Sequence, residues 1–311
     1  MIGSRDPLMP FRKRITINQP LDLQQTLESG QTFRWRKFSE SRWVGVIGDS
    51  IWVLSKQGNV IDIETSKNPV EGLESSVKSY FRLDDDLVDI QRKIGFDEYV
   101  AKGIAKNPGL RILRQDPWET LVAFILSSTS NVPRIARTME LLASELGDSL
   151  ELNGIERNTF PKPAALINAG ETYLRDLKCG FRAPYLIAAA NHVQSGFINL
   201  EELRHVPYDD ALIVLKSLPG VAEKIADCVM LFSLDHLEAF PVDRWIKRAM
   251  TQWYLLGEKS NYQTITDWAR GKFGNLSGYA NQYIYWDIRQ TERPMIGSGS
   301  TIPLKPKIPK G

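Results

Sequence analysis

The chain has 311 residues, which is long enough for two domains, and its 42% hydrophobic and 24% charged residues are ordinary for a globular protein. Its two cysteines, Cys179 and Cys228, exclude a disulfide framework and any four-cysteine zinc or iron–sulfur site, and they suit a reducing cytoplasm, nucleus or nucleoid. The N-terminus has no apolar run typical of a signal peptide, no stretch has the roughly 18 apolar residues of a membrane span, and a net charge of +2 permits a nucleic-acid partner without predicting one.

The first third of the chain predicts short antiparallel strands. Aromatic and β-branched residues, punctuated by Gly, Ser, Asp and Asn, fill four segments: 32–38, 42–49, 50–57 and 59–66. A short helix over residues 21–29 precedes them, and Gly30 follows it as a helix-ending glycine would. We therefore expect an antiparallel meander with a helix laid on it.

After about residue 70, apolar residues recur at a spacing of three and four, which predicts helices. The predicted helices cover residues 70–81, 87–94, 117–128, 133–146, 183–196, 208–218, 221–234, 243–255 and 278–290. Pro, Gly, Ser and Lys dominate after Arg293 and predict a disordered basic tail. We expect an α+β protein with an antiparallel sheet domain and leading helices over 1–115, a mainly α-helical body over 116–292 and a tail over 293–311.

The stretch Leu218-Pro219-Gly220-Val221 separates two predicted helices and is too short for anything but a tight hairpin. Pro219 stiffens the turn, and Gly220 can take a positive φ. The first amides of the following helix have no partner within it, so Gly220, Val221 and Ala222 can offer N–H groups to an anion such as a DNA phosphate. The alternative is a plain helical hairpin without a ligand, which is common.

Lys224 lies in the first turn of the helix that follows this hairpin. At helical spacing its neighbours are Val221, Cys228 and Leu231, so a charged amine lies along an apolar edge. The positive end of the helix dipole and burial both disfavour the charged form, and a neutral amine is a nucleophile. The alternative is a surface lysine whose stem covers apolar groups while its amine reaches water.

Asp243 opens the next predicted helix, directly after Pro241 and Val242. This is the position of an N-cap, whose carboxylate accepts backbone N–H groups. A capping carboxylate is held rigidly and is expected to stay ionised. It can therefore also stabilise a positive charge that develops nearby, and the two roles are compatible.

These residues, together with several longer segments, resemble one superfamily. A hairpin glycine, a lysine four residues later and a following Pro-Val-Asp are similar to the pattern of the helix-hairpin-helix (HhH-GPD) DNA glycosylases. Within that superfamily the chain most resembles the eukaryotic-type 8-oxoguanine DNA glycosylases, over roughly residues 12–290. The segments that carry the resemblance are SGQTFRWR (29–36), LRILRQDPWETLVAFILSS (110–128), GFRAPY (180–185), LPGVAEKIADCVMLFSLD (218–235) and PVD (241–243).

The resemblance implies roles for residues at matching positions. The family's catalytic lysine falls on Lys224 and its catalytic aspartate on Asp243. The backbone carbonyl that distinguishes oxidised guanine falls on Gly30, because oxidised guanine carries a proton at N7 where guanine has an acceptor. A glycine fits this role since the backbone itself must approach the base.

Other matching positions imply contacts with DNA. The aromatic wedge that fills the base stack falls on Phe181, where the family has a tyrosine. The two arginines that read the orphaned cytosine fall on Arg134 and Arg182, for which a phosphate contact is the alternative. Cys228 and Tyr285 fall on the walls that sandwich the extruded base, although a free cysteine also packs well as a small apolar group.

The chain departs from the family at three places. The family's three asparagines before the base-reading helix are Thr-Ser-Asn here, so only Asn131 matches, and the shorter Thr129 cannot fill the place of the extruded base. The usual second hairpin glycine is Ala222. The glutamine that binds the pairing edge of the base falls on Asn281, one methylene shorter, and the neighbouring Gln282 is the alternative.

The resemblance implies a bifunctional DNA repair glycosylase and AP lyase. It would flip 8-oxoguanine, preferably opposite cytosine, out of damaged double-stranded DNA, release the base by attack of Lys224 on C1′, and nick the strand by β-elimination. No cofactor and no catalytic metal are expected, because the three histidines are scattered. We expect an intracellular monomer with no membrane partner.

Two alternatives remain open from the sequence. An alkylpurine glycosylase of the same superfamily would use the aspartate alone, so Lys224 argues against it. A non-catalytic hairpin protein would bind DNA phosphates only and would leave the apolar placement of Lys224 unexplained. Borohydride trapping discriminates among the three, because it captures only a lysine–sugar imine.

Overall fold

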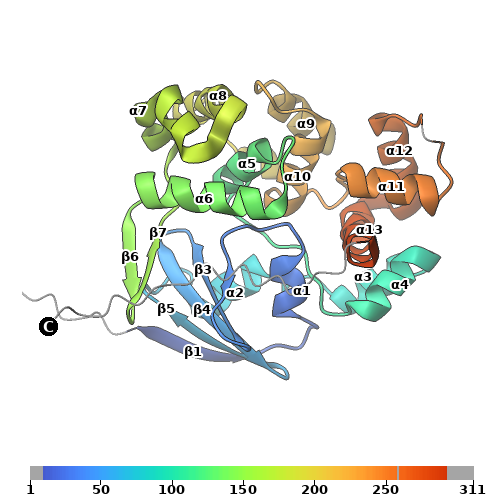
Figure 1. The fold of residues 1–311 in the computed structure, drawn as a ribbon. Helices are drawn as coiled ribbons and strands as arrows, with labels where there is room; N and C mark the ends of the chain where they lie inside the picture. Colours follow the sequence, from blue (N-terminus) through green and yellow to red (C-terminus); the bar gives the residue numbers. More distant parts are fainter. Residues whose placement is uncertain (1–9, 258, 293–311) are drawn as a thin grey trace, which may run out of the picture.

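The computed structural model describes residues 10–257 and 259–292, beginning with a five-stranded antiparallel sheet in the order β1-β5-β4-β3-β2 (Figure 1). The strands are β1 (Phe11–Thr16), β2 (Arg36–Lys37), β3 (Arg42–Ile47), β4 (Ser50–Gln57) and β5 (Val60–Thr65). The predicted meander over β2 to β5 is confirmed. The sequence reading missed β1, which pairs with β5; it is basic and mostly exposed, as edge strands often are.

The first predicted strand, 32–38, is wrong in extent, since only Arg36–Lys37 pairs in the sheet. The residues before it run as an irregular segment because their two aromatic side chains are buried in different places. Phe33 packs into the core of the helical body, whereas Trp35 packs under the sheet.

Both faces of the sheet are covered, which explains the continuous apolar run Ile51–Leu54 in β4. Trp52 and Leu54 pack with helices α1 (Leu23–Glu28) and α2 (Leu73–Tyr80). On the other face, Ile51 and Val53 pack against a second hairpin, β6 (Ser149–Leu152) and β7 (Ile155–Asn158). The sequence reading missed this hairpin, although its turn is Asn-Gly, the strongest short hairpin signal.

The rest of the described chain is mainly helical, and each of the nine helices predicted after residue 70 is present with small shifts at its ends. Helices α4, α7 and α12 were not predicted, although Asp97 and Asn261 cap α4 and α12 and could have indicated them. The helices are α3 (Leu87–Ile94), α4 (Glu98–Lys106), α5 (Pro117–Leu126), α6 (Val132–Leu146), α7 (Pro163–Leu174), α8 (Ala183–Gln194), α9 (Tyr208–Lys216), α10 (Glu223–Ser233), α11 (Arg244–Gln252), α12 (Tyr262–Phe273) and α13 (Ser277–Glu292).

Helices α5 and α10 form the centre of the helical body. Every residue of α10 from Ile225 to Ser233 is buried, and so is α5 from Thr120 to Leu126. Helices that are apolar around their whole circumference are expected in the interior. Helix α13 approaches α10 closely, because a Cβ added at Gly278 would lie 2.2 Å from the Leu231 side chain.

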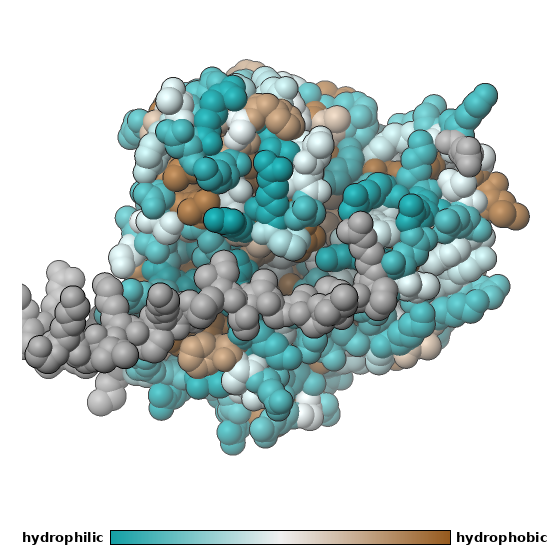
Figure 2. Space-filling model, viewed as in Figure 1, coloured by the Kyte–Doolittle hydropathy of each residue, from teal (hydrophilic) through white to brown (hydrophobic). Residues whose placement is uncertain are grey.

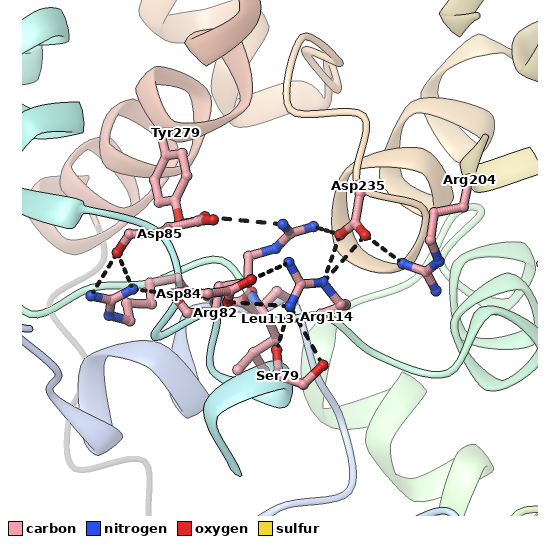
Figure 3. Close-up of polar contacts among 11 residues, drawn as sticks. Ser79, Arg82, Asp84, Asp85, Leu113, Arg114, Arg204, Asp235 and Tyr279 are labelled. Carbon is pink, nitrogen blue, oxygen red and sulfur yellow. Dashed lines mark hydrogen bonds and ion pairs between the residues drawn. The ribbon is translucent and has the colours of Figure 1, made fainter. Parts of the chain in front are cut away.

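A charged cluster around Asp235 joins the sheet-bearing part of the chain to the helical body (Figure 3). The Asp235 carboxylate accepts hydrogen bonds from Arg114 at 2.9 Å, from Arg204 at 2.8 Å and from Arg82. Burial alone would raise the pKa of this carboxyl, but the surrounding arginines outweigh burial and hold the pKa below its usual value. Asp235 follows the end of α10, so the cluster anchors the segment that leads to Asp243.

The surface seen in Figure 2 is mostly hydrophilic, with hydrophobic residues scattered in small groups. No helix within residues 10–257 and 259–292 is long and apolar enough to cross a membrane. In the same residues, no group of three or more His, Cys, Asp or Glu side chains is placed to hold a metal ion. The tail predicted over 293–311 lies outside the described residues.

Candidate active site

A cavity of about 510 Å³ opens between the end of α1 and the helices α5, α6, α10, α11 and α13. Its size is typical of sites that enclose a small ligand. Eight of the residues singled out from the sequence line it, although they come from five separate parts of the chain. They are Gly30, Asn131, Lys224, Cys228, Asp243, Asn281, Gln282 and Tyr285.

Lys224 lies in the first turn of α10, whose N-cap, Ala222, makes no side-chain hydrogen bond. The predicted apolar edge is confirmed, since Val221, Cys228 and Leu231 are all buried. The amine lines the cavity and donates to Ser127 Oγ at 2.7 Å. A lysine that only covered the surface would instead direct its amine to water.

Asp243 is the N-cap of α11, as predicted: its Oδ1 accepts from the backbone N–H groups of Trp245 and Ile246, both at 2.9 Å. Burial raises the pKa of this carboxyl, and the two backbone donors and the Lys224 charge act in the opposite direction. The backbone just before Asp243 is also fixed, because Asn281 Nδ2 donates to the Pro241 carbonyl at 3.0 Å. The carboxyl group is therefore fixed in the same cavity as the Lys224 amine.

Gly30 has a φ of +80°, a conformation that favours glycine, and it follows the end of α1 as the sequence predicted. A Cβ at this position would lie 2.9 Å from Tyr285 Oη and 3.3 Å from the Arg289 guanidinium. Gln282 Nε2 donates to the Ser29 carbonyl at 3.1 Å and so fixes the backbone just before Gly30. Both the backbone conformation and the close packing thus require a glycine here.

Two further side chains form walls of the cavity. Cys228 is buried, and burial raises the pKa of its thiol to about 12, so the thiol is neutral at ordinary pH. Tyr285 is half-buried on α13, and burial also raises the pKa of its hydroxyl to about 12. Both groups therefore present uncharged surfaces, which suit a stacked heterocycle.

The residues predicted to contact the duplex lie around the loop before α6. Asn131 caps α6, since its Oδ1 accepts from the backbone N–H of Arg134 at 3.0 Å. Arg182 is buried and donates to the Ser128 carbonyl at 2.8 Å and to the Thr129 carbonyl at 3.2 Å. Thr129 has a φ of +51°, a strained conformation for a β-branched residue and one that asparagine tolerates better.

Arg134 and Phe181 are exposed, and neither they nor Arg182 lines the cavity. The Arg182 guanidinium lies 4.3 Å from the centre of the Phe181 ring, so the two side chains stack on each other. These three residues therefore lie outside the cavity.

The predicted hairpin is present, and Gly220 has a φ of +79°. A Cβ there would lie 2.4 Å from the Tyr185 ring, so close packing also requires glycine. The prediction that Val221 offers a free amide is wrong, because its N–H donates to the Leu218 carbonyl at 3.1 Å within the turn. Phosphate binding would therefore rely on the amides of Gly220 and Ala222.

The sequence reading missed several residues that line the cavity: Phe124, Ser127, Arg244, Trp245 and Arg289. Arg289 lies one turn beyond Tyr285 on α13, so the helical spacing could have indicated it. Nothing in the sequence indicates Ser127, since only the packing of α5 against α10 brings it to Lys224.

Comparison with known proteins connects this fold and site to DNA repair. Residues 14–121 match the family described as "8-oxoguanine DNA glycosylase, N-terminal domain", and residues 122–270 match "HhH-GPD superfamily base excision DNA repair protein". The fold is thus that of a helix-hairpin-helix base excision repair enzyme.

Individual relatives narrow this class. The Saccharomyces cerevisiae "N-glycosylase/DNA lyase" is 30% identical over 80% of this chain and 73% of its own length. The Methanothermobacter thermautotrophicus "Probable N-glycosylase/DNA lyase" is 28% identical over 87% and 94%. The Clostridium acetobutylicum 8-oxoguanine glycosylase/lyase, solved with double-stranded DNA that has cytosine opposite 8-oxoguanine, is 31% identical with a TM-score of 0.83 over 88% of this chain and 93% of its own. The chain belongs to the 8-oxoguanine DNA glycosylase family and is a DNA glycosylase and AP lyase.

Proposed function

We propose that this enzyme releases 8-oxoguanine from duplex DNA after flipping the base into the cavity between Gly30 and α10. The observation that carries the proposal is that the Lys224 amine and the Asp243 carboxyl line one cavity together with the Gly30 backbone. The neutral Cys228 thiol and the Tyr285 ring are proposed to lie against the two faces of the base. The Gly30 carbonyl is proposed to accept a hydrogen bond from the N7–H group, which guanine lacks.

The proposed reaction begins when Lys224 Nζ, having lost a proton, bonds to C1′ of the sugar and the bond from C1′ to N9 breaks. The amine gives up a proton as the new bond forms, and the leaving base takes up a proton. Positive charge develops on the sugar ring during this step, and the fixed carboxylate of Asp243 stabilises it electrostatically. The resulting adduct opens to a Schiff base between Lys224 and C1′. Loss of a proton from C2′ then allows the bond from C3′ to its phosphate oxygen to break, which nicks the strand.

We also propose that Arg134 and Arg182 favour cytosine in the opposite strand. Guanidinium groups are donors only, and an orphaned cytosine offers acceptors at O2 and N3, whereas adenine presents a different edge. A well-formed bidentate contact contributes about 1–3 kcal/mol, which corresponds to roughly ten- to a hundredfold discrimination. To contact the base, Arg182 would have to leave the Ser128 and Thr129 carbonyls or share its donors with them.

Single-turnover excision of 8-oxoguanine opposite cytosine and opposite adenine tests this function. We expect 8-oxoguanine to be released faster opposite cytosine, with 3-methyladenine released far more slowly in the same duplex. Arg134→Ala and Arg182→Ala should each reduce the ratio of the two rates. Faster release of 3-methyladenine would favour an alkylpurine glycosylase, and an unchanged ratio would make the arginines phosphate contacts.

A further inference from the structure

A serine hydroxyl holds the amine of Lys224. Lys224 Nζ donates to Ser127 Oγ at 2.7 Å, and Ser127 Oγ in turn donates to the Phe124 carbonyl at 2.6 Å. Because the single hydroxyl proton is used by Phe124, the oxygen presents only its lone pairs to the amine. Ser127 therefore acts as an acceptor with one fixed orientation.

The surroundings of the amine fix the direction from which it enters the cavity. The Phe124 ring centre lies 5.4 Å from Nζ, and the ring packs edge-on against Phe33, so this contact surface is itself immobilised. Asp243 is the carboxylate in the same cavity, but its Oδ1 accepts two backbone N–H groups of α11. The end of α5 thus supplies the hydroxyl and the ring that orient the lysine.

Such a restraint matters because a free lysine side chain samples many rotamers, whereas attack on C1′ requires one narrow geometry. The hydrogen bond to Ser127 holds Nζ at the wall of the cavity, since Lys224, Ser127 and Asp243 all line it.

We propose that Ser127 is a positioning residue that aims the Lys224 amine at C1′ of the flipped nucleotide. This inference rests on the proposed role of Lys224 as the nucleophile. In this proposal Ser127 contacts the nucleophile, Lys224 Nζ, but neither the sugar nor the base. Its loss should therefore affect the rate of bond formation and not the affinity for the lesion.

Ser127→Ala tests the proposal, because it removes the acceptor while keeping a residue compatible with the end of α5. We expect single-turnover excision and borohydride trapping to fall roughly ten- to a hundredfold. The dissociation constant for the same lesion duplex should stay within about twofold of wild type. Ser127→Thr keeps the hydroxyl and should restore most of the rate. Ser127→Cys keeps the shape of the side chain, but its thiol is a weak acceptor, so this variant should lose as much of the rate as Ser127→Ala. It tests the proposal independently if Ser127→Ala folds poorly.

Ser195→Ala is the matched control. Ser195 also follows the end of a helix, α8, and its Oγ also donates to a carbonyl three residues back, that of His192. It does not line the cavity, so this variant should retain the wild-type rate.

Wild-type trapping by Ser127→Ala, or a loss of lesion binding that matches the loss of rate, would overturn the proposal. Lys224→Gln, measured in parallel, separates this failure from that of the proposed function, because trapping by that variant would remove Lys224 itself as the nucleophile.

Discussion

At the scale of single residues, a conservative substitution can separate the helix cap that Asp243 forms from the catalytic charge proposed for it. Asn caps helices about as well as Asp, so Asp243→Asn should keep the bonds to Trp245 and Ile246 and change the free energy of unfolding by less than about 1 kcal/mol. The compensating charge is lost, however, so single-turnover excision should fall about a hundredfold or more. Melting temperature and rate are measured on the same preparation. A large loss of stability with an intact rate would show a purely structural residue.

The pH dependence of the rate checks the same residue. Because burial raises the pKa of Asp243, the wild-type rate should begin to fall on acidification at a higher pH than it would for an exposed aspartate. The Asp243→Asn variant has no carboxyl at this position, so its remaining activity should lack this acidic limb.

At the scale of elements, helix α10 contains a buried charge whose effect depends on pH. Asp227 is fully buried, accepts from Tyr208 at 2.6 Å and from Tyr262 at 2.5 Å, and has its pKa raised to about 6 by burial. A raised pKa means that folding favours the protonated form, so stability is lost as pH rises through about 6. Arg270 lowers this pKa and Glu223 raises it.

Asp227→Asn should therefore stabilise the fold most, relative to wild type, at alkaline pH. The difference in free energy of unfolding between variant and wild type should grow by up to about 3 kcal/mol from pH 4 to pH 8 in the direction of a more stable variant. Urea denaturation at several pH values measures it. A difference that is constant across this range would contradict the account of Asp227.

Elements with strong local signals could be predicted from the sequence, and those with weak signals could not. Helices α3 and α5 begin at the predicted residues, because apolar periodicity and an aspartate N-cap coincide there. Helix α7 was missed since Gly170 interrupts it with a φ of +75°. In the site, local patterns indicated Lys224 and Asp243, and the resemblance supplied most of the remaining positions. Ser127 could not be predicted because it lies 97 residues from Lys224 in the sequence.

At the scale of the whole molecule, the cluster around Asp235 holds the sheet-bearing part against the helical body (Figure 3). Its contact with Arg82 joins residues 153 apart in the sequence, which no local pattern can indicate. Asp235→Ala would leave the buried Arg82 without this partner, so the free energy of unfolding should fall by about 3 kcal/mol. Asp267→Ala is the control, because its pair with Arg270 lies at the surface and should cost less than about 0.5 kcal/mol. Equal losses in the two variants would contradict this role.

The central claim is that Lys224 forms the covalent bond to DNA. The most direct test is borohydride reduction during turnover of a duplex with 8-oxoguanine opposite cytosine, followed by peptide mass spectrometry of the trapped protein. We predict that the adduct lies on Lys224, that Lys224→Gln binds the lesion but forms no adduct, and that Lys102→Gln, which changes an exposed lysine on α4, traps normally. An adduct on any other residue, or trapping by Lys224→Gln at the wild-type rate, would contradict the account.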